Sequence, residues 1–130
     1  MIVLDASAAI EYLLGTPPGA RVAQRIGEDE TVHAPHLLDL EVAQVLRRLV
    51  RGGELAGRRA EQAIAGLRDF AIFRYGHEGL LTRVWALRGS LTAYDAAYVA
   101  LAESLGAPLL TRDARLARAG GHQAAIEVIG

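Results

Sequence analysis

The sequence contains no cysteine, and this absence excludes several classes of site at once. A disulfide-linked scaffold, a zinc site built from thiolates and a cysteine nucleophile all need that residue. Lysine is absent as well, so all 14 basic residues are arginines. Arginine suits bidentate contact with phosphate, but a lysine-free, alanine-rich composition is also typical of a GC-rich genome.

Long apolar runs are missing too. No apolar stretch approaches the ~20 residues of a membrane-spanning helix. The first residues lack a basic segment ahead of a hydrophobic one, so we expect no signal peptide. The formal net charge is −1, so there is no global basic field for nucleic acid, although metal ions can meet phosphates locally. We therefore expect a soluble, cytoplasmic protein.

The residues that are present favour one folded domain over positions 1–130. Apolar residues make up 52% of the chain, which argues against disorder. At this length a domain buries roughly two-thirds of its unfolded surface. Short apolar segments are expected as strands over 1–4, 31–34, 71–75, 109–111 and 125–129. Helices are expected over 7–14, 20–26, 37–51, 56–70, 78–87, 92–105 and 114–119.

The alternation of these segments predicts an α/β fold. Short apolar strands separated by helices indicate a parallel sheet that is covered on both faces. The Gly52-Gly53 link between two long helices predicts an antiparallel helical hairpin. Apolar residues on both helices of this hairpin either pack onto the sheet or form a groove for a partner; they are Leu46, Leu49, Val50, Ile64 and Leu67.

Four acidic residues adjoin segments that should be core: Asp5, Glu41, Asp95 and Asp113. Asp5 and Asp113 follow strands, whose carboxyl ends line the ligand-binding crevice of such folds. Glu41 and Asp95 lie near helix starts on the same rim. Each acid alone has a simpler explanation: Asp5 and Asp113 as helix N-caps, Asp95 in a capping box with Thr92, and Glu41 as a solvated helix residue. Because carboxylates are rarely buried without a partner, four on one rim favour a bound cation.

The ligand type predicts which cation. A set of oxygen ligands suits Mg²⁺ or Mn²⁺ rather than zinc, and the histidines show no metal-binding spacing. Such an ion activates water and neutralises phosphate charge, and four acids can hold one ion or two. The hydroxyls of Ser7 and Thr111 are expected either to position a water or phosphate oxygen, or to cap a helix and pair within a strand. Arg112 either contacts phosphate or balances the acids.

Several segments together resemble the PIN-domain family, specifically toxins of the VapC type. They are Met1-Ile2-Val3-Leu4-Asp5-Ala6-Ser7-Ala8, Pro35 with Glu41 in the helix that follows, residues 91–102 (LTAYDAAYVALA) and Leu110-Thr111-Arg112-Asp113. The resemblance implies a three-layer α/β/α fold and a Mg²⁺- or Mn²⁺-dependent endoribonuclease. It places the family's acidic site on Asp5, Glu41, Asp95 and Asp113, and its usual hydroxyl on Thr111. It also implies a cognate VapB-type antitoxin that blocks the site, and a toxin homodimer.

One position departs from the family pattern, and several alternatives stay open. The family commonly carries asparagine three residues after the helical glutamate, where this chain has Gln44. A receiver-type domain normally needs a lysine, which is absent, and aspartate-nucleophile phosphatases usually place a second acid where Ser7 stands. A PIN nuclease of RNA maturation or decay without an antitoxin, and a catalytically silent PIN-like binding module, are the remaining alternatives.

Overall fold

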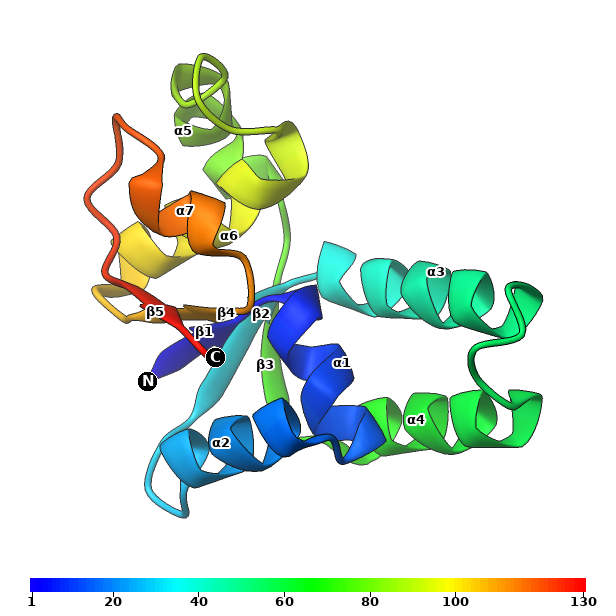
Figure 1. The fold of residues 1–130 in the computed structure, drawn as a ribbon. Coiled ribbons are helices and arrows are strands. Elements are labelled where there is room, and N and C mark those ends of the chain that lie inside the picture. The colour runs from blue at the N-terminus through cyan, green and yellow to red at the C-terminus, as the bar shows by residue number, and fades with distance from the viewer.

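The computed structural model describes all residues from 1 to 130 and contains one sheet of five parallel strands (Figure 1). The strands lie in the order β3-β2-β1-β4-β5, so β1 is central. Their bounds are β1 (Ile2–Leu4), β2 (Val32–Pro35), β3 (Ile72–Tyr75), β4 (Leu109–Thr111) and β5 (Ile126–Val128). The α/β prediction with a central parallel sheet is therefore confirmed.

Helices cover both faces of this sheet, which makes three layers. Figure 1 shows α5, α6 and α7 on one side, and α1, α2 and α4 on the other. Their bounds are α1 (Ala6–Leu14), α2 (Pro17–Ile26), α3 (Leu37–Arg51), α4 (Gly57–Asp69), the 3-10 helix η1 (Glu78–Leu80), α5 (Leu81–Ala86), α6 (Ala93–Leu105) and α7 (Ala114–Arg118). None of these helices is long and apolar enough to cross a membrane.

The core lies between the sheet and its covering helices. The strand residues of β1 and β4 are completely buried, as expected for parallel strands covered on both faces. Helix α6 is almost as deeply buried, because every residue from Ala96 to Ala102 is inaccessible to solvent or nearly so. Small alanines dominate that segment, so α6 packs closely against β1, β2 and β4. This burial fixes the first turn of α6, which carries Asp95, relative to the ends of β1 and β4.

Helices α3 and α4 form the predicted antiparallel hairpin, which extends away from the sheet (Figure 1). The turn between them uses Gly53, whose φ of 74° lies in the left-handed region that favours glycine. Leu67 packs inward and is only 4% exposed, whereas Val50 and Ile64 remain partly accessible. The hairpin therefore has both an inner face that joins the core and an apolar surface between the helices.

Two helix boundaries differ from the sequence prediction. Pro17 and Pro18 do not precede α2 but form its first turn, where proline's missing N–H is tolerated, and Thr16 caps the helix by accepting from the N–H of Gly19 at 3.1 Å. Gly19 is needed there because a Cβ would lie 2.0 Å from the carbonyl oxygen of Glu11. The helix expected over 78–87 is divided into η1 and α5.

Candidate active site

Asp5 is the most firmly held of the four acids. It leaves the central strand β1 and caps α1, because its Oδ1 accepts from the backbone N–H of Ala8 at 3.0 Å. The hydroxyl of Ser7 donates to the same oxygen at 2.7 Å, and the hydroxyl of Thr111 donates to Oδ2. The residue is only 6% exposed. Three donors from two different segments therefore fix both carboxylate oxygens.

The two hydroxyls also tie the end of β1 to the turn after β4. The Ser7 hydroxyl accepts from the backbone N–H of Arg112 at 2.9 Å, and that of Thr111 accepts from the N–H of Asp113 at 3.0 Å. The two hydroxyl oxygens lie 3.3 Å apart. Ser7 therefore does not cap the first helix, a role that Asp5 takes, and both hydroxyls face the predicted site.

Glu41 and Asp95 approach from helices on different sides of this rim. Thr92 caps α6 by accepting from the N–H of Asp95 at 3.1 Å, which is one half of the predicted capping box; the Asp95 carboxylate makes no return hydrogen bond to the N–H of Thr92. Glu41 lies one turn into α3 and is half-buried. The hydroxyl of Tyr98 donates to its Oε1 at 2.6 Å. Burial and the hydrogen bond to Glu41 raise the pKa of Tyr98 far above its usual value, so the phenol remains a donor.

Asp113 is paired within its own segment. It caps α7 by accepting from the N–H of Arg115 at 2.9 Å, and the guanidinium of the same arginine reaches its Oδ2 at 2.6 Å. These contacts lower the pKa of Asp113. The Arg115 side chain is 79% exposed, so this ion pair sits at the surface, where such pairs contribute little to stability.

The other three acids have raised pKa values. Burial raises the pKa of Asp5, and the charge on Asp95 adds to that rise against the opposing hydrogen bonds. Burial likewise raises the pKa of Glu41, and the charges on Asp95 and Asp5 raise it further. Burial raises the pKa of Asp95 and the charge on Asp113 adds to the rise, while a hydrogen bond with Thr92 and the charge on Arg115 oppose it. The four carboxyls therefore influence one another electrostatically, and Asp95 interacts with each of the others.

This donor set fits a hard divalent cation. The four candidate metal ligands are all carboxylates, which offer oxygen, and Asp5, Glu41 and Asp95 take part in no ion pair. A cation would relieve the repulsion that raises their pKa values. As the side chains stand, no three acidic or histidine residues form a group that could hold one ion. Side chains would therefore have to move for the set to gather around one cation.

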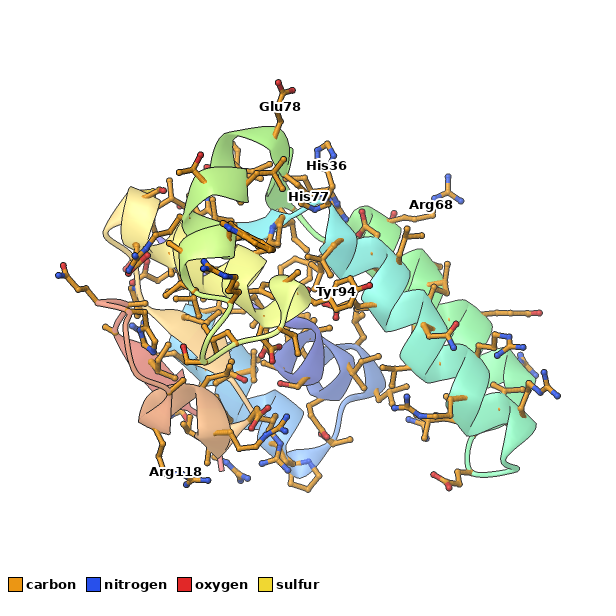
Figure 2. The ribbon with its side chains drawn as sticks, turned by 90° about the horizontal axis from the view of Figure 1, so that it is seen from above. His36, Arg68, His77, Glu78, Tyr94 and Arg118 are labelled. Atoms are coloured by element: carbon orange, nitrogen blue, oxygen red, sulfur yellow. The ribbon has the colours of Figure 1, made fainter.

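Two small cavities flank the acids. One, of about 170 Å³, includes Asp95, Asp113 and Arg115 in its lining. The other, of about 320 Å³, is lined by Leu37, Leu40, Glu41, Gln44 and Tyr94. Figure 2 shows Tyr94 at the start of α6, next to α3. Gln44, where the family commonly has asparagine, is thus exposed near Glu41 without a hydrogen bond to the acids.

Two residues that contact the acids carry no signal of that role in the sequence. Tyr98 lies one helical turn after Asp95, a spacing that equally suits a core residue, and its partner Glu41 is 57 positions away. Arg115 is one of several arginines near Asp113. Arg112 was expected at phosphate or near the acids, but its guanidinium donates to the carbonyl of Ile129 at 2.9 Å.

The fold and this rim of carboxylates define a member of the PIN-domain family: the sequence matches the PIN domain over residues 2–122, and the chain belongs to that family. The predicted resemblance to the VapC type is confirmed by its relatives. The ribonuclease VapC12 from Mycobacterium tuberculosis is 43% identical over 129 residues, which cover 99% of each chain.

Solved structures agree on the fold. The structure of PAE2754 from Pyrobaculum aerophilum superposes with a TM-score of 0.71 at 27% identity, covering 98% of this chain and 83% of that one. VapBC2 from Rickettsia felis, solved bound to a DNA fragment from its promoter, matches with a TM-score of 0.73 at 11% identity and covers 100% of both chains.

Proposed function

We propose that this protein is an endoribonuclease of the VapC type, the toxin of a toxin–antitoxin pair, and that it depends on a divalent metal ion. The observation that carries the nuclease activity is the whole-length similarity to VapC ribonucleases at 41–43% identity. The cluster of mutually repelling carboxyls at the ends of β1 and β4 supports the metal dependence. We further propose that residues 1–130 form a single PIN domain.

The carboxylates of Asp5, Glu41, Asp95 and Asp113 would hold Mg²⁺ or Mn²⁺. When bound, such an ion lowers the pKa of a coordinated water and neutralises the charge that develops on the scissile phosphate. Asp5 supplies a preorganised ligand, because three hydrogen bonds fix it. Ser7 and Thr111 hold Asp5 and the turn that carries Asp113, so they position the site even if they touch no substrate.

Arg115 is the charged partner of Asp113. Its guanidinium pairs with the Asp113 carboxylate and lowers the pKa of that carboxyl. If Asp113 were to serve as a metal ligand instead, the exposed Arg115 guanidinium would be available to contact an RNA phosphate in bidentate fashion. A chain with no net positive charge would thereby bind polyanionic RNA through a local arrangement of metal and arginine.

The surface between α3 and α4 is the proposed antitoxin-binding groove. Its cavity has a volume of about 530 Å³ and is lined by Ala43, Leu46, Arg47, Val50, Arg51, Gly57, Ala60, Glu61 and Ile64. An apolar floor with charged residues at its margin suits an amphipathic helix from a partner. Three of the five apolar residues singled out from the sequence line this groove: Leu46, Val50 and Ile64.

A homodimer and a cytoplasmic location complete the proposal. Sedimentation of the isolated chain is expected to show a dimer at micromolar concentration, and a monomer throughout that range would contradict it. Identifying a small antitoxin gene next to this one separates the toxin from a PIN nuclease of RNA maturation or decay.

The central experiment maps RNA cleavage. Purified, antitoxin-free protein is incubated with defined RNAs in the presence of Mg²⁺, Mn²⁺ or a chelator, and the cut sites are mapped. Cleavage at discrete positions that stops with the chelator is expected. Metal binding without any cleavage would favour the silent binding module, and cleavage that is unaffected by the chelator would contradict the metal-dependent mechanism.

A further inference from the structure

Tyr98 connects the buried core to the acidic rim. It lies on α6 and is only 2% exposed, so its ring is held by the surrounding packing. Its hydroxyl donates to Oε1 of Glu41 at 2.6 Å, across the gap between α6 and α3. Because Tyr98 stands three positions after Asp95 on the same helix, the two side chains lie on one face. The buried Tyr98 ring therefore holds one hydrogen-bond donor, its hydroxyl, against one oxygen of the Glu41 carboxylate.

Glu41 has no other anchor. The Tyr98 hydroxyl is the one hydrogen-bonding partner of its carboxylate, which also takes part in no ion pair. Its nearest charged neighbours, Asp95 and Asp5, repel it. A free glutamate side chain has several rotamers and would gain both entropy and separation by extending into solvent. The hydrogen bond from Tyr98 is therefore the attraction that can hold the Glu41 carboxylate near the other acids.

We propose that Tyr98 is a positioning residue for the metal site, and that it keeps the Glu41 carboxylate turned toward Asp5 and Asp95 with Oε2 left for the cation. This inference rests on the proposed function, since it assumes that Glu41 is a metal ligand. Tyr98 would not bind the metal itself but would hold Glu41, a side chain that does. Outer partners of this kind typically change metal affinity by about 10- to 100-fold when they are removed.

The test compares two equivalent substitutions. Tyr98→Phe removes the hydroxyl and keeps the ring, and Tyr75→Phe is the matched control, because the Tyr75 hydroxyl likewise bonds a buried side chain, that of His33, at 2.7 Å. Titration calorimetry with Mn²⁺ is expected to show affinity weaker by about tenfold in Tyr98→Phe, with the control unchanged. RNA cleavage by Tyr98→Phe should then recover substantially as Mn²⁺ is raised to saturation. Thermal unfolding in chelator confirms that both variants are folded.

A double-mutant comparison tests whether Tyr98 affects metal affinity through Glu41. In Glu41→Gln, the further change Tyr98→Phe is expected to alter Mn²⁺ affinity by less than about twofold, because the ligand on which it acts is already neutral. An equal loss in both backgrounds, or an unchanged affinity in Tyr98→Phe alone, would overturn the positioning role and leave the proposed function intact. Absence of Mn²⁺ binding by the parent protein would overturn both.

Discussion

Replacing Asp5 by asparagine should separate metal binding from folding. Burial raises the pKa of Asp5 in the folded protein, so the carboxyl contributes stability at low pH that is lost as the pH rises through the folded-state pKa. At neutral pH the charge is therefore a cost. Asparagine removes that charge, and the Thr111 hydroxyl, 3.3 Å from that of Ser7, has a neighbouring oxygen to which it can turn. In chelator, Asp5→Asn should be as stable as the parent to within about 1 kcal/mol.

With metal, the parent should become more stable than Asp5→Asn. A ligand present at 100 times its dissociation constant stabilises the state that binds it by about 2.7 kcal/mol. For a chain of 130 residues this raises the melting temperature by about 10 °C, taking ~2.1 cal/mol/K per residue for the entropy of unfolding. The parent should show this rise with Mn²⁺, and Asp5→Asn should show little of it.

Calorimetric melting with and without Mn²⁺ measures the effect, and RNA cleavage should fall by about 10²- to 10³-fold or more. Asp29→Asn is the control, because Asp29 is an exposed acid in the turn after α2. A folded Asp5→Asn protein that cleaves RNA at the parent rate, or that keeps the full rise with Mn²⁺, would refute the role assigned to this carboxylate.

Three further predictions address the groove, the ion pair and the pH dependence. Val50→Asp places a charge in the α3–α4 groove and should abolish antitoxin binding in a pull-down, while cleavage of RNA by the isolated chain stays unchanged. Arg115→Ala should raise the pKa of Asp113, observed by NMR titration, tighten Mn²⁺ binding and weaken RNA binding; effects of the same sign on both ligands would contradict its proposed exchange between Asp113 and phosphate. Because burial raises the pKa values of Asp5, Glu41 and Asp95, protons should compete with Mn²⁺ for these carboxyls, so the Mn²⁺-induced rise in melting temperature should shrink as the pH falls.

The sequence was sufficient for the layered fold and for the N-caps of α1, α6 and α7. Alternating apolar strands and helices leave few topologies open, because parallel strands need covered faces and right-handed connections. The capping roles of Asp5, Thr92 and Asp113 depend on neighbours two or three positions away, so local pattern is enough to predict them. The metal-ligand roles of the four acids remain predictions.

Long-range partners could not be predicted in this way. The contact of Tyr98 with Glu41 depends on how α6 and α3 meet at the rim, a relation that no local pattern encodes. Whether Arg112 or Arg115 pairs with Asp113 depends on the directions in which these two side chains point after β4. Proline usually breaks a helix, so local propensity predicts that α2 begins after the proline pair. The cap that Thr16 provides instead places both prolines in the first turn of α2.

Helix α3 carries a proposed metal ligand near its start and part of the proposed antitoxin-binding groove near its end. Glu41 lies near its start and Val50 lies in the groove near its end, about 13 Å apart at the ordinary rise per residue. An antitoxin that tilts α3 while filling the groove would therefore displace a metal ligand without touching it. By thermodynamic linkage, the cation would in turn alter the affinity for the antitoxin by the same factor, so the metal supply of the cell would bear on how tightly the toxin is restrained.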